Sequence, residues 1–161
     1  MPHQADSSRP LDTPQIPVQL KLAAAWTSFM FLYIYVDYLF LYKPGVIDSI
    51  LAGIVWEFEI NQTFVTTAIA LLSIPILMIV LSVTLPARVN RATNLVVATL
   101  YIPFSIFNAV GETWTYFFGL SIGLEVLLLG FILRSAWTWP RKSAPATAGT
   151  AAMALPQQAH A

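Results

Sequence analysis

Residues 63–85 read TFVTTAIALLSIPILMIVLSVTL, twenty-three consecutive residues without a charge. A helix needs about 20 apolar residues to cross the roughly 30 Å hydrocarbon core of a bilayer. The run is continuous and lacks the period-two alternation of a barrel strand, so it predicts a membrane-spanning helix. This stretch decides the fold class, because the surface of a small soluble domain cannot accommodate it.

Three other stretches have a similar length and character: residues 22–42, 92–110 and 114–133. The first contains one acidic residue, Asp37, and the last contains Glu125, whereas the middle stretch is uncharged. Together with the first run, they predict an all-α fold, an integral membrane four-helix bundle.

The composition of the whole chain agrees with this prediction. Of 161 residues, 57% are hydrophobic and 10% are charged, whereas soluble domains carry about 25% charged residues. A formal net charge of zero argues against a nucleic-acid partner, which would select a basic surface. The chain has no cysteine, and its two histidines are His3 and His160, both near the termini. We therefore expect no disulfide, no metal site and no cofactor, and a protein that is not an enzyme.

Two prolines fall in the middle of predicted spans, Pro75 and Pro103. A proline lacks the backbone N–H and leaves the carbonyl four residues earlier without its helical partner. In a membrane this is tolerated where a neighbouring group satisfies the freed carbonyl.

The basic residues predict the orientation of the bundle. If the four helices alternate in direction, seven of the eight basic residues lie on one side, and only Lys43 lies on the other. The positive-inside rule then places both termini in the cytoplasm. Five of these residues are expected to anchor the spans at lipid headgroups: Arg88, Arg91, Arg134, Arg141 and Lys142.

The segments outside the spans differ in character. Residues 1–17 are polar and rich in proline, and residues 143–161 are of low complexity, so both are predicted to be disordered cytoplasmic tails. The membrane domain then covers residues 18–142. Apolar residues at helical spacing over residues 46–56 predict a short amphipathic helix on the outer interface, anchored by Trp56.

Glu125 lies near the predicted midplane of its span. An ionisable residue inside a span costs at least about 2.5–3 kcal/mol, so it usually faces the bundle interior. The span cores contain no basic residue, which leaves Glu125 without a counter-ion and favours its neutral form. Hydroxyls of Tyr33, Ser73 and Tyr101 are predicted at a similar depth. Three interpretations remain open: a structural hydrogen bond between helices, a proton-linked or ligand-binding site, or a side chain facing lipid.

Asp37 is predicted nearer the outer end, within reach of water. Tyr33, Asn108 and Glu112 are expected near its level or above it, which would form an acidic vestibule that attracts cations or cationic solutes. The alternative is that Asp37 merely extends toward the interface.

These features support two hypotheses of different classes. The first is a membrane protein of unknown activity that binds a small ligand, a cation or a lipid in an outward-facing cavity. The alternative is a structural or accessory subunit, which packs against a membrane partner protein or a second copy of itself. Gly119 and Gly123 have the spacing that lets a neighbouring helix approach closely. Membrane lipids are the expected surroundings in both cases.

Several segments resemble a known family. KLAAAWTSFMFLYIYVDYLFLYKPG is followed by IDSILAG, SIPILMIVLSVTLP, RVNR and AWTWPRK. This order resembles a small family of bacterial four-span membrane proteins that carries only a domain-of-unknown-function label, over about residues 19–142. The resemblance implies one four-helix domain in a bacterial inner membrane. It implies no activity and no catalytic residues.

Overall fold

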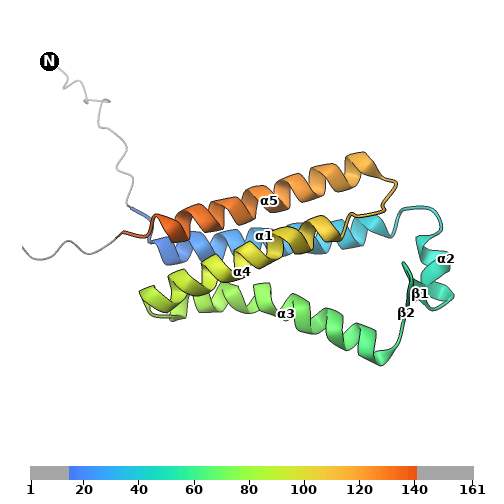
Figure 1. Ribbon diagram of the computed structural model, residues 1–161, viewed down its shortest axis with the longest axis horizontal. Coiled ribbons are helices and arrows are strands. Elements are labelled where there is room, and N and C mark those ends of the chain that lie inside the picture. The colour runs from blue at the N-terminus through green and yellow to red at the C-terminus, as the bar shows by residue number, and fades with distance from the viewer. Residues whose placement is uncertain (1–14, 141–161) are drawn as a thin grey trace, which may run out of the picture.

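The structure, a computed structural model, describes residues 15–140 and is mainly helical (Figure 1). The predicted tails fall almost entirely outside the described residues, as do Arg141 and Lys142. The elements, in chain order, are α1 (Val18–Phe40), α2 (Val46–Leu51), β1 (Ile54–Val55), β2 (Phe58–Glu59), α3 (Gln62–Thr84), α4 (Ala87–Phe107) and α5 (Thr115–Trp137).

The four long helices of this region pack side by side. α1 contacts α3 and α5, and α4 contacts the same two helices. The start of α1, the turn between α3 and α4, and the end of α5 lie at one end of the molecule (Figure 1). The segment with α2 and the two strands lies at the other end, which we call the hairpin end. Successive long helices therefore run in opposite directions.

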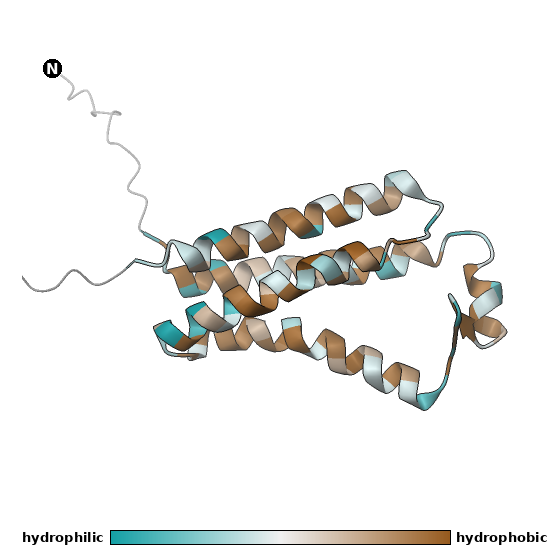
Figure 2. Ribbon diagram, in the orientation of Figure 1, coloured by the Kyte–Doolittle hydropathy of each residue, from teal (hydrophilic) through white to brown (hydrophobic). Residues whose placement is uncertain are grey.

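Within residues 15–140, three helices are long and apolar enough to cross a membrane: α1, α3 and α5. Apolar residues predominate along them, and hydrophilic residues gather at the turn between α3 and α4 (Figure 2). α4 is nearly as long, with 21 residues, but its first turns carry several polar and charged residues. The predicted span over residues 92–110 falls mostly within α4, which is not among the three.

The turn between α3 and α4 is shorter than the sequence indicates. Leu85 precedes Pro86 and is extended, because a residue before proline is disfavoured in the helical region. α4 then begins at Ala87 rather than at residue 92. Asn90, which the predicted spans leave in the connection between them, therefore lies in α4, and both Asn90 and Asn94 are fully buried.

Asn94 is the centre of a buried polar network near this end. Its Oδ1 accepts a hydrogen bond from Trp26 Nε1 at 2.7 Å, and its Nδ2 donates to the Asn90 side chain at 2.7 Å. Asn90 Nδ2 donates in turn to the backbone carbonyl of Ser82 at 2.6 Å. The network joins α1, α3 and α4. The apolar core surrounds it with Leu22, Phe29, Met78, Leu129 and Ile132.

Pro75 is fully buried in α3 and leaves the carbonyl of Leu71 without its helical donor. The hydroxyl of Tyr101, on α4, donates to that carbonyl at 2.6 Å. The expectation that a neighbour satisfies the freed carbonyl is confirmed here. Toward the hairpin end, the first half of α3 diverges from α1 and α4 (Figure 1).

The segment between α1 and α3 differs from the predicted helix over residues 46–56. α2 ends at Leu51, because Gly53 adopts a left-handed backbone with φ of 82°. The chain continues as an antiparallel hairpin in which Val55 pairs with Phe58. Trp56 lies in the turn with φ of 53°, an uncommon conformation for a bulky residue. The prediction of an all-α chain is therefore wrong in this segment.

The Asn94 network predicts a stability effect. Asn94→Leu keeps a similar volume but leaves Trp26 Nε1 and the Asn90 side chain without their partner. We expect the free energy of unfolding to fall by about 1–3 kcal/mol, measured by circular dichroism during denaturation by dodecyl sulfate in mixed micelles. Thr93→Ala is the control, because the Thr93 hydroxyl bonds only to the carbonyl of Val89 in its own helix. An equal effect of both variants would contradict the role of the network.

The contact at Pro75 predicts a coupling that a double-mutant cycle measures. Tyr101→Phe should cost about 1 kcal/mol of unfolding free energy in the wild-type background, because the Leu71 carbonyl loses its donor. In the Pro75→Ala background the cost should fall by half or more, since the new backbone N–H at position 75 can donate to the same carbonyl. Tyr116→Phe, at a side chain 96% exposed, is the control. Equal costs in the two backgrounds would refute the coupling.

Candidate functional site

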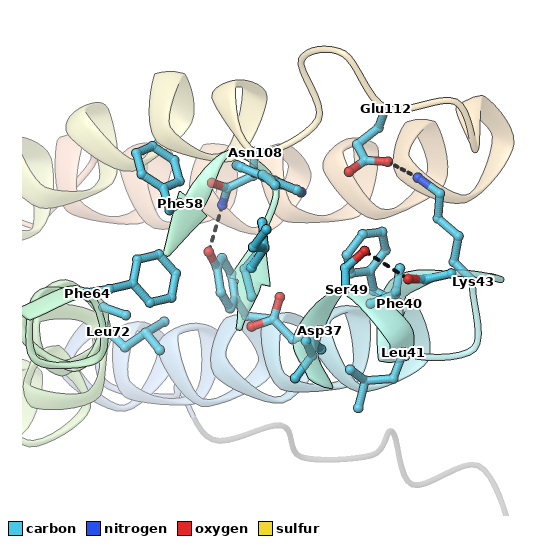
Figure 3. Close-up of a pocket in the computed structure, with 18 of the residues that line it drawn as sticks. Asp37, Phe40, Leu41, Lys43, Ser49, Phe58, Phe64, Leu72, Asn108 and Glu112 are labelled. Atoms are coloured by element: carbon cyan, nitrogen blue, oxygen red, sulfur yellow. Dashed lines mark hydrogen bonds and ion pairs between the residues drawn. The ribbon is translucent and has the colours of Figure 1, made fainter. Parts of the chain in front are cut away.

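A cavity of about 790 Å³ lies at the hairpin end, between α1, α3 and α4. Residues 41–58, with α2 and the hairpin, form much of its wall (Figure 3). The divergence of α3 makes room for it, and Leu71, beside the proline contact, is one of its lining residues. We call it the large cavity.

The wall of the large cavity is largely apolar and aromatic. Phe58 and Phe64 stack there with ring centroids 6.1 Å apart. The polar side chains are few, apart from the indole of Trp56: Tyr33 and Asp37 of α1, Lys43, Ser49, Thr67 of α3, Asn108 and Glu112. The aromatic lining residues are Tyr33, Phe40, Trp56, Phe58, Phe64 and Phe104.

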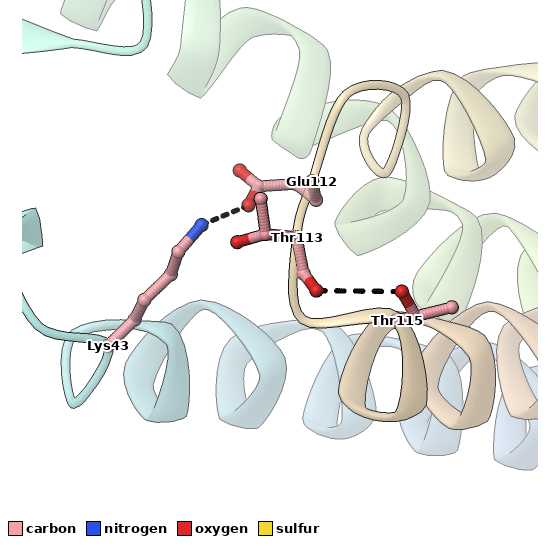
Figure 4. A network of polar contacts seen from close by, with 4 residues as sticks. All are labelled: Lys43, Glu112, Thr113 and Thr115. Atoms are coloured by element: carbon pink, nitrogen blue, oxygen red, sulfur yellow. Dashed lines mark hydrogen bonds and ion pairs between the residues drawn. The ribbon is translucent and has the colours of Figure 1, made fainter.

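Lys43 and Glu112 form an ion pair at the rim of the large cavity (Figure 4). The pair joins the turn after α1 to the loop between α4 and α5, and the Glu112 side chain is only 8% exposed. The Lys43 ammonium also lies 5.3 Å from the centroid of the Phe40 ring. The sequence placed Glu112 in an acidic vestibule, but in the structure Lys43 neutralises it. The vestibule is less acidic than expected.

Tyr33 and Asn108 connect α1 to the end of α4. Asn108 Nδ2 donates to the Tyr33 hydroxyl at 2.6 Å (Figure 3). The hydroxyl oxygen is thereby fixed in place, and both residues line the large cavity. The structure therefore brings together four of the residues that the sequence grouped: Tyr33, Asp37, Asn108 and Glu112.

Asp37 lies one helical turn after Tyr33, on the same face of α1. Its side chain is exposed, and its carboxylate points into the large cavity (Figure 3). Lys43–Glu112 is the ion pair that the structure shows among residues 15–140, so Asp37 has no basic partner within that range. Of the charged side chains that line the large cavity, Asp37 alone is uncompensated.

A second, smaller cavity of about 130 Å³ lies between α1, α4 and α5. Glu125 lines it and is 4% exposed. Ser105 lines it as well, and among the described residues its buried hydroxyl has no hydrogen-bond partner. Asp37 and Trp56 border both cavities. Asp37 and Glu125, which the sequence placed in separate environments, thus both line the smaller cavity.

The predicted hydroxyl neighbours of Glu125 are placed differently. Ser73 Oγ donates to the carbonyl of Ala70 in its own helix, and Tyr101 donates across to α3. Of the three predicted hydroxyl groups, only that of Tyr33 borders the same cavity as Glu125. Sequence reasoning missed Ser121, although it lies one turn before Glu125 and so on the same helical face.

Trp56 is a second residue whose position was not anticipated. It was expected to anchor a helix at the outer interface, but it borders both cavities from the turn of the hairpin. Its left-handed backbone conformation costs on the order of 1–3 kcal/mol, which the surrounding structure must offset. No pattern in the sequence signals this conformation.

The basic anchors lie at the opposite end from the cavities. Arg88 is exposed in the first turn of α4. The Arg91 guanidinium lies 5.7 Å from the centroid of the Trp137 ring. Arg134 is exposed in the last turn of α5.

Residues 17–146 match a family described as a family of unknown function, DUF6326. The chain belongs to this family. The match covers every helix and both strands, and it confirms the resemblance to a family of unknown function. No curated protein and no solved structure matches the chain. Membership in DUF6326 supplies no activity, so a functional interpretation depends on the two cavities.

Proposed function

We propose that this DUF6326 protein is a four-span membrane protein that binds a small ligand in its large cavity. The observation that carries the proposal is the cavity itself. Its volume of about 790 Å³ falls within the 300–1,000 Å³ typical of small-molecule sites. An apolar and aromatic wall with a few convergent polar groups is also typical of such sites.

The distribution of residues on α4 supports a fourth span. Its 21 residues extend about 31 Å, which matches the hydrocarbon thickness. Three polar side chains distributed along it point inward, since Asn90, Asn94 and Ser105 are buried. The side chains exposed along the same helix are mostly apolar and suit a lipid environment, among them Val89, Val96, Leu100, Ile106 and Phe107.

The positions of the basic residues support an orientation with both termini in the cytoplasm of a bacterial cell. Lys21, Arg88, Arg91 and Arg134 lie at the end away from the cavities. Of the basic residues that the structure describes, Lys43 alone lies at the hairpin end, where it is paired with Glu112. By the positive-inside rule the large cavity then faces the outer side of the inner membrane.

Because the chain has no cysteine, one introduced thiol can report whether a reagent reaches the large cavity. Thr67 lines the large cavity, so a Thr67→Cys variant places one thiol inside it. We expect a membrane-impermeant trimethylammonium methanethiosulfonate, added outside intact spheroplasts, to modify this thiol, because the cavity admits water. Mass spectrometry of the purified full chain measures the extent of labelling.

Ile69→Cys is the matched control for the access experiment. It lies two residues further along α3, is 57% exposed and does not line the cavity. A thiol in hydrocarbon stays protonated and unreactive, so this variant should remain unmodified. Labelling of Thr67→Cys only from the cytoplasmic side would overturn the orientation. No labelling from either side would overturn the binding function.

One observation favours the accessory-subunit alternative. The sequence predicts that a neighbouring helix approaches closely at Gly119 and Gly123. Within residues 15–140, no helix lies against these two glycines. A Cβ placed on either glycine would meet no atom within 4 Å. This face of α5 is therefore free for a helix of a partner or of a second copy.

The alternative predicts that bulk on this face breaks an assembly. Gly123→Leu should reduce the mass of the native complex extracted in mild detergent, as measured by native mass spectrometry, because a leucine prevents close helix contact. Ala70→Leu is the control, since it adds similar bulk at an exposed position on a different helix, α3. A wild-type protein that runs as a monomer would contradict the alternative.

A further inference from the structure

We propose that the ligand of the large cavity is a hydrophobic organic cation, a quaternary ammonium, phosphonium or protonated amine carried on an apolar body. The inference rests on the proposed binding function and specifies the chemical class of the ligand. It follows from the uncompensated charge of Asp37 together with the aromatic wall around it.

The charge balance of the cavity selects a cation. Three charged side chains line it, and Lys43 and Glu112 neutralise each other at the rim. The carboxylate of Asp37 remains, and it points into the open space (Figure 3). A charge within a span is costly unless it is compensated, and a positively charged ligand would compensate this one. An anionic ligand would meet the same carboxylate and be repelled.

The aromatic wall selects an organic cation over a hydrated inorganic one. Aromatic faces attract cations through the ring quadrupole, and aromatic cages are a common device for recognising quaternary ammonium groups. The protein already uses this interaction, because the Lys43 ammonium lies 5.3 Å from the centroid of Phe40. Phe58, Phe64 and Phe104 supply further apolar surface for the body of the ligand.

The polar groups near Asp37 are too few for an inorganic cation that must shed its water. Hard cations take six or more oxygen ligands in protein sites. Tyr33 and Asn108 line the large cavity with Asp37, and Glu125 shares the smaller cavity with it, but within residues 15–140 no three Asp, Glu, His or Cys side chains come together as they would around a metal ion. A diffuse charge buried within an apolar body needs no such shell, so it matches the surroundings that the cavity provides.

Tetraphenylphosphonium is the probe that tests this inference, and tetraphenylborate is its match in size and shape with the opposite charge. The full chain, reconstituted in nanodiscs, should bind radiolabelled tetraphenylphosphonium in equilibrium dialysis, above the level of empty nanodiscs. Tetraphenylborate, measured in a separate dialysis, should not bind above the level of empty nanodiscs. Asp37→Asn keeps the shape of the side chain and removes its charge, so affinity should fall about tenfold or more.

Two variants serve as controls for the binding experiment, and a third tests the aromatic wall. Asp37→Glu keeps the charge and should retain most of the affinity. Asp48→Asn removes a carboxylate of the same end that does not line the cavity, and should leave binding unchanged. Phe64→Leu keeps apolar bulk but removes a ring, and should weaken binding about threefold or more.

Two results would overturn the inference. One is equal binding of tetraphenylphosphonium by the wild type and Asp37→Asn. The other is a protein that binds tetraphenylborate or lipid in the cavity in preference to the cation. In either case, a positive Thr67→Cys access result would leave the proposed binding function standing. If Thr67→Cys is not labelled from either side, both the proposed binding function and this inference are refuted.

Discussion

The buried side chain of Asn94 is the interaction on which the arrangement of the helices depends. In the membrane that we propose surrounds these helices, they gain little from burying apolar surface against one another, because lipid is equally apolar. Packing and hydrogen bonds must then hold them in register. Asn94 receives the indole N–H of Trp26 and donates to Asn90, which reaches the carbonyl of Ser82. One amide thereby connects three of the four long helices at the end that carries the basic residues.

The large cavity results from the loosening of this arrangement toward the other end. Pro75 interrupts the hydrogen-bond ladder of α3, and Tyr101 satisfies the carbonyl that is freed. Beyond this point the first half of α3 diverges, and the chain between α1 and α3 closes over the gap. The ion pair between Lys43 and Glu112 fixes that covering segment to the opposite loop. The helices are thus joined by the Asn94 network at one end, and the large cavity lies at the hairpin end.

Much of the fold followed from the sequence because long apolar helices have a strong local signal. The predicted spans over residues 63–85 and 114–133 correspond closely to α3 and α5. The exact start of α4 was less clear, because the sequence indicates a polar connection before residue 92, whereas α4 begins at Ala87 and contains the buried Asn90 and Asn94. Their burial depends on hydrogen-bond partners in other helices, which no local pattern shows. The hairpin after α2 was missed for a similar reason, since it depends on left-handed conformations at Gly53 and Trp56.

The sequence by itself determined that the chain is helical and strongly apolar, and it identified Asp37 and Glu125 as the two acidic residues within the apolar helices. Each of these conclusions depends on local composition and period. Only the tertiary structure decided that Lys43 neutralises Glu112, whereas Asp37 has no basic partner within residues 15–140. It also decided that Asp37 and Glu125 border the same smaller cavity. The physical reason is that charge compensation depends on distances between side chains far apart in the chain. Lys43 and Glu112 are separated by 69 positions, and only the packing of the helices brings them together.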